Sequence, residues 1–282
     1  MSFNYLAALS CIECKNLYLP KNSTAIDLGC QTPSISIDNI IEFLQINKKK
    51  IYEDQIFNLK KLKETKFSTY DFFKSLNYLE YKSIDINGAL GSFHFDLNFT
   101  IQDKYNFHEQ YDLVINNGTG EHIFNQYSFF NNFHNLTKKN GYMLNILPFI
   151  DWINHGFYNF NPIIFADMAA SNNYEIIKIS LANRWGSEIE LKKEEQLVFF
   201  DQIKPNDINS NFNKLINIAK DKLGSNIIIK AILKKNGDSS FQTPLQGKYI
   251  EDVKNFNLDY SRQKKGSAEA LGQISDGKKR EN

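Results

Sequence analysis

Short apolar runs alternate along this chain with longer segments in which apolar residues recur every three or four positions. The runs predict strands at residues 24–28, 81–86, 92–97, 111–116, 142–147, 175–181 and 226–234. The longer period predicts two or three helices between residues 31 and 79, and single helices at about 125–136, 163–172 and 212–223. Strands that alternate with helices are typical of βα units, so the pattern favours an α/β fold with a mostly parallel sheet flanked by helices.

The same pattern divides the chain into segments. The stretch between the first two strands, at about residues 34–79, is long and mostly polar, and we interpret it as a helical insertion after the first strand. Residues 261–282 are polar, contain Gly and Ser, and have no apolar period, which predicts a flexible tail. We expect residues 1–260 to form one domain, because a chain of this length buries a core without disulfides.

Composition narrows the function classes. The net charge of +1 argues against a dedicated nucleic-acid binder, which usually carries a basic excess. Three cysteines, an odd number, favour a reducing compartment, and the single CxxC at Cys11 and Cys14 lacks the second ligand pair of a structural zinc site. There is no signal-peptide pattern, and Asn145, Pro148 and Asp151 interrupt the most apolar stretch. We expect a cytoplasmic protein with a small-molecule partner, no nucleic acid and no membrane. The oligomeric state stays open.

Polar and glycine residues follow several of the predicted strands. In an open parallel sheet, ligands bind outside the carboxyl ends of the strands. A carboxylate after the second strand is well placed to accept hydrogen bonds from two ribose hydroxyls. A carboxylate after the third strand could meet an adenine amino group. A glycine in the turn after the first strand lets the backbone approach the ligand closely. The alternative is that Asp27 and Asp96 only cap turns. The candidate cofactor-binding residues are Asp27, Gly29, Cys30, Asp85, Ile86, Asp96, Leu97, Asn116 and Asn117.

Four motifs resemble those of the class I S-adenosylmethionine-dependent methyltransferases. They are Ala-Ile-Asp-Leu-Gly-Cys at residues 25–30, Ser-Ile-Asp-Ile at 83–86, Tyr-Asp-Leu-Val-Ile at 111–115 followed by Glu-His-Ile at 121–123, and Lys-Lys-Asn-Gly-Tyr-Met-Leu at 138–144. Their order and spacing cover about residues 24–180. The resemblance implies a Rossmann-like fold, S-adenosylmethionine as cofactor, and methyl transfer to a small hydroxylated acceptor such as a sugar or other metabolite, with oxygen favoured over nitrogen.

Two features depart from the pattern of that family. Gly29 is followed by Cys30-Gln31-Thr32-Pro33, where the family usually has more glycines, so contacts to the methionine end are less secure than those to the ribose. Residues 87–91 are also too few for a crossover helix between the second and third strands.

The segment after the fifth strand combines aromatic and polar side chains. It predicts an acceptor pocket with Trp152, Asn154 and Tyr158 as substrate-binding residues, although a packed loop with incidental aromatics is the alternative. His155 is the candidate catalytic base, and His122 is its rival. Glu121 and His122 have no further ligand at matching spacing, so we predict no metal there and expect methyl transfer to need none. By location, the insertion at residues 34–79 could form a lid over this pocket.

Two other functions remain open from the sequence. An NAD-dependent oxidoreductase also uses an acidic residue after the second strand, but Gly29 stands alone where GxGxxG is expected. A non-catalytic, methyltransferase-like binding subunit is the second alternative.

Overall fold

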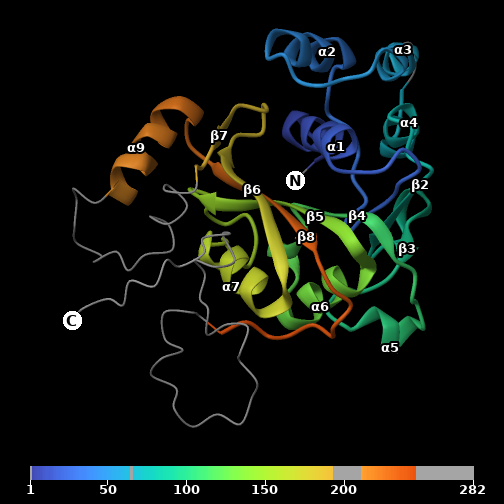
Figure 1. Ribbon diagram of the computed structural model, residues 1–282, viewed down its shortest axis with the longest axis vertical. Coiled ribbons are helices and arrows are strands. Elements are labelled where there is room, and N and C mark those ends of the chain that lie inside the picture. The colour runs from blue at the N-terminus through green and yellow to red at the C-terminus, as the bar shows by residue number, and fades with distance from the viewer. Residues whose placement is uncertain (1, 64–65, 193–210, 246–282) are drawn as a thin grey trace.

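An eight-stranded sheet organises the computed structural model, which describes residues 2–63, 66–192 and 211–245 (Figure 1). The strand order is β3-β2-β1-β4-β5-β8-β6-β7. The strands are β1 (Thr24–Asp27), β2 (Glu80–Asp85), β3 (Phe93–His94), β4 (Tyr111–Asn117), β5 (Thr137–Ile150), β6 (Tyr174–Ala182), β7 (Glu188–Glu190) and β8 (Ile227–Lys235).

Strand direction defines the ligand-binding edge. β1 pairs in parallel with both β2 and β4, β2 pairs in parallel with β3, and β4 pairs in parallel with β5. β8 runs antiparallel to both β5 and β6, and β7 runs antiparallel to β6. The strand order reverses between β1 and β4, which is the switch point where open α/β sheets bind their ligands. The predicted mostly parallel, Rossmann-like sheet is therefore confirmed.

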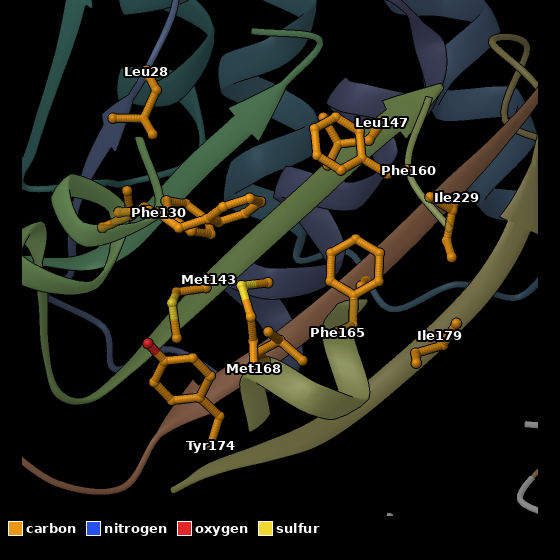
Figure 2. Close-up of a cluster of buried hydrophobic side chains, with 14 of the residues drawn as sticks. Leu28, Phe130, Met143, Leu147, Phe160, Phe165, Met168, Tyr174, Ile179 and Ile229 are labelled. Carbon is orange, nitrogen blue, oxygen red and sulfur yellow. The ribbon is translucent and has the colours of Figure 1, made fainter. Parts of the chain in front are cut away.

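Helices cover both faces of the sheet (Figure 1). They are α1 (Tyr5–Leu17), α2 (Ile37–Ile46), α3 (Glu53–Leu62), α4 (Thr69–Ser75), α5 (Ile101–Tyr105), α6 (Gln126–Leu136), α7 (Ile163–Asn172) and α9 (Asn211–Leu223), with short 3₁₀ turns η1 (Ala89–Gly91) and η2 (Gly120–His122). Successive residues of a strand point to opposite faces. Thus Leu113 and Ile115 of β4 belong to the core cluster that includes residues of α1 to α4, whereas Val114 belongs to the cluster that includes residues of α6, α7 and α9. Figure 2 shows Phe165 and Met168 lying between α7 and the sheet, near Met143 of β5.

Local sequence explains where several helices begin. Ser68 and Asp71 form a capping box at the start of α4, with a distance of 3.2 Å from the Asp71 amide to the Ser68 hydroxyl. Asn125 caps α6 by accepting a hydrogen bond from the Ser128 amide at 3.1 Å. The predicted helical insertion is confirmed, because α2, α3 and α4 all lie between β1 and β2.

The structure corrects several predicted boundaries. The third strand is only Phe93–His94, because the Asp96 side chain accepts the Asn98 amide at 2.9 Å in a turn that ends it. The fifth strand, predicted at residues 142–147, already begins at Thr137, so Asn140 and Gly141 lie inside β5, at an irregularity where Asn140 has φ 62°. The sequence analysis missed α1, whose two sides are both buried, and also α5 and β7. The predicted tail at residues 261–282 lies outside the described residues.

A buried charge network joins α1 to the far half of the sheet. Lys230 of β8 contacts Glu13 of α1 at 2.5 Å and Glu188 of β7 at 3.1 Å. Lys178 of β6 contacts the same two carboxylates at 2.8 and 2.7 Å. The four groups therefore neutralise one another away from water.

No described helix is long and apolar enough to cross a bilayer.

Candidate functional site

The carboxyl ends of β1 and β2 meet as the sequence predicts. Asp85, the last residue of β2, accepts hydrogen bonds from the backbone amides of Cys30 at 3.2 Å and Asn87 at 3.1 Å. Asp27, the last residue of β1, is fully buried and accepts the Gly29 amide at 3.2 Å through Oδ1. Its Oδ2 has no hydrogen-bond partner among the described residues, and burial raises the pKa of this carboxyl well above its ordinary value. Two carboxylates thus flank the turn after the first strand.

The turn itself is packed against the loop after β4. A Cβ atom added at Gly29 would lie 2.4 Å from the Thr119 hydroxyl, so only glycine permits this approach. Gln31, which stands where the resembled family usually has glycine, accepts a hydrogen bond from the Asn117 side chain at 2.5 Å and donates one to the Asn117 carbonyl. Its side chain therefore bridges the ends of β1 and β4. Neither Thr119 nor Gln31 was singled out from the sequence as a contact.

The other predicted cofactor residues occupy different environments. Asn116 is buried, and its amide is already used by Asn145 at 3.0 Å and by the Gly120 backbone at 3.0 Å. Leu97 is part of the hydrophobic core, and Asp96 holds the turn after β3. Ile86 is 61% exposed beside the end of β2, where it is free to contact a ligand. Asp27, Gly29, Cys30, Asp85 and Ile86 thus form the part of the predicted set that is gathered around one turn.

The 3₁₀ turn after β4 carries a buried carboxylate. Glu121 is fully buried, and neither of its carboxylate oxygens has a hydrogen-bond partner in the described part of the chain. Burial raises the pKa of Glu121 to about 7. The carboxylate therefore lies in surroundings that disfavour its charged form unless a cation compensates it.

The loop after β5 closes directly over this carboxylate. The backbone amides of Phe157 and Tyr158 donate to the Glu121 carbonyl at 2.8 and 3.3 Å. A Cβ atom at Gly156 would lie 2.9 Å from both the Cγ and the carbonyl oxygen of Glu121, so a side chain at this position would displace the loop. Gly156 and these hydrogen bonds fix His155 beside Glu121.

Three side chains meet at this point. His155 Nε2 lies 3.4 Å and His122 Nε2 lies 3.9 Å from the same oxygen, Glu121 Oε1. The two imidazole rings are 5.1 Å apart at their centroids. Burial lowers the pKa of both histidines, which favours their neutral form as bases or metal ligands. The sequence analysis found Glu121 and His122 but no third ligand, and the structure supplies one in His155.

The predicted acceptor-binding residues surround His155 unequally. Trp152 packs against the His155 ring with centroids 4.8 Å apart, and its indole donates to the Ile227 carbonyl at 3.0 Å. Tyr158 donates its hydroxyl to the Phe124 carbonyl at 3.0 Å. Asn154 is exposed, with φ 57°. Trp152 and Tyr158 thus have fixed positions, and Asn154 presents its amide to solvent.

Comparisons with known proteins were made for sequence and for structure. No family model and no curated protein matches the chain. Among solved structures, the chain is similar to the O-methyltransferase of a trans-AT polyketide synthase multienzyme of Brevibacillus brevis in complex with S-adenosyl-L-homocysteine. The two chains are 14% identical, with a TM-score of 0.43, and the match covers 94% of this chain and 77% of that one.

Two further solved structures are similar. One is a SAM-dependent methyltransferase from Archaeoglobus fulgidus, with 11% identity, a TM-score of 0.40, and coverage of 82% of this chain and 94% of that one. The other is a putative methyltransferase from Bacillus halodurans, with 12% identity, a TM-score of 0.38, and coverage of 81% and 99%. The Rossmann-like architecture of the chain follows from its strand order and pairing directions.

Proposed function

We propose that the protein is a class I S-adenosylmethionine-dependent methyltransferase that acts on an oxygen of a small hydroxylated acceptor, such as a sugar or other metabolite. The observation that carries this proposal is the junction of β1 and β2 at the switch point of the sheet. There Asp85 accepts the Cys30 amide, and Asp27 lies one turn away with an unpaired oxygen. A nucleoside with a cationic amino-acid tail needs such carboxylates, because they accept hydrogen bonds from its ribose and attract its ammonium group.

The residues present fit the nucleoside half of that cofactor better than the methionine half. The Asp85 carboxylate is only partly buried, so it can accept ribose hydroxyls as well as backbone amides. Asp27 Oδ2 is an acceptor that no described residue uses. The Gln31 side chain, by contrast, fills the space between the ends of β1 and β4. We therefore assign ribose contact to Asp85, and contact with the amino-acid tail to Asp27 after a rearrangement of Gln31.

The chain's own contribution to catalysis would be to position the acceptor and remove its proton. S-adenosylmethionine supplies an activated sulfonium methyl group. The loop after β5 lies at the same edge of the sheet and brings His155 Nε2, a neutral base with a lowered pKa, to within 3.4 Å of Glu121. An acceptor hydroxyl held between this imidazole and the methyl group would react as if both were at very high local concentration. Such positioning is among the largest contributions to the rate of group-transfer reactions.

The acceptor side of the site has an apolar rim. Phe124, Ile153 and Phe157 are 72%, 84% and 66% exposed, and the Phe124 and Phe157 rings pack edge to face with centroids 5.8 Å apart. Exposed aromatic side chains beside a few fixed polar groups are typical of pockets for small ligands. They support an acceptor that combines a hydroxyl group with an apolar body.

The alternative NAD-dependent oxidoreductase is disfavoured by the path of the chain. NAD-binding sheets place the pyrophosphate at a helix N-terminus directly after the first glycine turn. Here β1 ends at Asp27, and α2 begins only at Ile37. The other alternative, a non-catalytic cofactor-binding subunit, would use the same Asp27 and Asp85 carboxylates and would lack only turnover.

Binding of S-adenosylhomocysteine to the wild type and to Asp85→Ala tests the cofactor assignment by titration calorimetry. A hydrogen bond to a charged group contributes about 1.5–3 kcal/mol, and Asp85 is partly solvated, so we expect affinity to fall at least tenfold. Asp221→Ala, on the exposed side of α9, is the matched control and should bind normally. Unchanged affinity in Asp85→Ala, or tighter binding of NAD than of S-adenosylhomocysteine, would contradict the proposal. Turnover with a hydroxylated acceptor separates the enzyme from the non-catalytic alternative.

A further inference from the structure

We propose that Glu121, His122 and His155 together bind one divalent first-row transition-metal ion. The three side chains come from two loops at the carboxyl edge of the sheet, η2 after β4 and the segment after β5. Their donor atoms all lie within 4.8 Å of one another. This site goes beyond the proposed methyl transfer, and its existence does not depend on the identity of the methyl donor.

The donor separations suit a metal ion. Around a tetrahedral ion with metal–ligand distances of about 2.0–2.1 Å, neighbouring donors lie roughly 3.3 Å apart. The separations from Glu121 Oε1 to His155 Nε2 and His122 Nε2 are 3.4 and 3.9 Å. The donor atoms of the two histidines lie within 4.8 Å of each other, so one of the imidazoles must move inward when the ion binds. His122 is the one that can turn, because its side chain is 44% exposed.

The isolation of the carboxylate is the second, independent observation. Glu121 is fully buried, both of its oxygens lack a hydrogen bond, and Nε2 of His155 lacks one too, within the described residues. A buried carboxylate without partners is costly, and such groups are normally paired or coordinate a metal. The ion-pair contacts of Glu121 in the described chain are with the two histidines alone, so no Lys or Arg supplies the missing charge.

The scaffold holds the donors in place without a ligand. Two backbone hydrogen bonds tie the β5 loop to the Glu121 carbonyl, and Gly156 permits the close approach. Trp152 packs against the His155 ring, with centroids 4.8 Å apart. Ligands of metal sites are commonly oriented by such surrounding contacts, which limit the reorganisation that binding requires.

The donor set selects the class of ion. Two imidazole nitrogens and one carboxylate oxygen suit Zn²⁺, Fe²⁺ or Co²⁺, whereas Mg²⁺ and Ca²⁺ prefer oxygen ligands throughout. Three protein ligands also leave coordination positions open for water or a substrate oxygen, as in catalytic metal sites. An acceptor hydroxyl bound there would lose its proton more readily. Because both imidazoles would then be metal ligands, neither could accept this proton, which would pass to solvent water instead.

Cobalt titration of the metal-free full-length protein tests the proposal, because Co²⁺ reports its coordination by visible absorption. We expect one equivalent of Co²⁺ to bind, with absorption bands of a four- or five-coordinate site, and stoichiometric Zn²⁺ to displace it. His155→Ala and Glu121→Gln should each weaken Co²⁺ binding at least tenfold, and Gly156→Ala should weaken it by displacing His155. His108→Ala, which removes an exposed histidine outside the cluster, is the control.

The outcomes separate a built site from adventitious binding. His122→Ala is a second ligand variant, and since His122 is exposed, its loss should leave the thermal unfolding temperature unchanged. Equal Co²⁺ affinity in the wild type and in His122→Ala and His155→Ala would overturn the proposal, as would displacement of Co²⁺ by millimolar Mg²⁺. S-adenosylhomocysteine is absent from this titration, so a lack of Co²⁺ binding would leave the proposed methyltransferase function intact. Likewise, a lack of S-adenosylhomocysteine binding would leave the proposed metal site intact.

Discussion

Substitution of Lys230 by methionine should destabilise the protein strongly. Lys230 is 1% exposed and lies between Glu13 at 2.5 Å and Glu188 at 3.1 Å. Methionine keeps much of the apolar stem but removes the ammonium group. Two buried carboxylates then share the single cation of Lys178. Removing one partner of a buried network leaves uncompensated charge and typically costs about 3–5 kcal/mol.

The pKa of Glu188 gives a second measure of how much this network stabilises the folded protein. Burial by itself would raise this pKa, but Lys230 and Lys178 lower it from 4.5 to about 2. Such a shift corresponds to roughly 3 kcal/mol of stabilisation at neutral pH, of which Lys230 supplies a part. The loss of its contact with Glu13, whose pKa is also lowered by Lys230, adds to this effect. For a chain of this size, the expected fall in melting temperature is about 6–20 °C.

Thermal and urea unfolding at several pH values provide the assay. Because the folded pKa of Glu188 is depressed, its contribution is complete above the unfolded pKa near 4.5 and is lost as pH falls towards 2. The gap between wild type and Lys230→Met should therefore be largest at pH 6–8 and shrink below pH 4.5. Lys234→Met, on the same strand but partly exposed, is the control and should cost under about 0.5 kcal/mol. If Lys230→Met lowers the free energy of unfolding by less than 1 kcal/mol, or by an amount that does not vary with pH, the reasoning is refuted.

Two further predictions concern thiol reactivity and the catalytic base. Cys11 and Cys14 are buried, and burial raises the pKa of Cys14 to about 12. Burial also raises the pKa of the Cys30 thiol, but Cys30 is partly exposed, so a thiol reagent should modify Cys30 first in the native protein. Equally fast reaction of all three cysteines would contradict this packing. If His155 is the base in a metal-independent reaction, His155→Ala should lower the methyl-transfer rate by about 10²–10⁴ with unchanged cofactor affinity, and His122→Ala should cost much less. Equal losses from both variants would point instead to their shared role as metal ligands.

Local patterns in the sequence determine much of this molecule. The apolar runs predict the cores of seven strands. The signal is strongest for strands such as β4 and β8, because burial on both faces requires continuous apolar side chains. Ser68 and Asn125 mark helix starts through side-chain hydrogen bonds that reach only three residues along the chain. The carboxylates after β1 and β2 were also predictable, since each ends a recognisable strand.

Elements with weaker local signals were missed. α1 is buried on both sides, so it has no polar face to reveal the helical period. The boundary of β3 depends on the Asp96 turn, and β7 has only three residues. The insertion of β8 between β5 and β6 follows from sheet pairing, which leaves no mark in the sequence of β8 itself.

The candidate metal cluster depends on contacts between distant residues. Glu121 and His155 meet only because β4 and β5 are parallel neighbours whose following loops share one edge, and because Gly156 lets those loops touch. The Glu13–Lys230 pair joins residues 217 positions apart. The period of apolar residues in the sequence depends on backbone conformation over a few neighbouring residues. The partner of a buried polar group depends instead on which distant segments the tertiary fold brings together. The sequence thus determined most of the elements and their order, and the tertiary structure decided which charged and imidazole groups face one another.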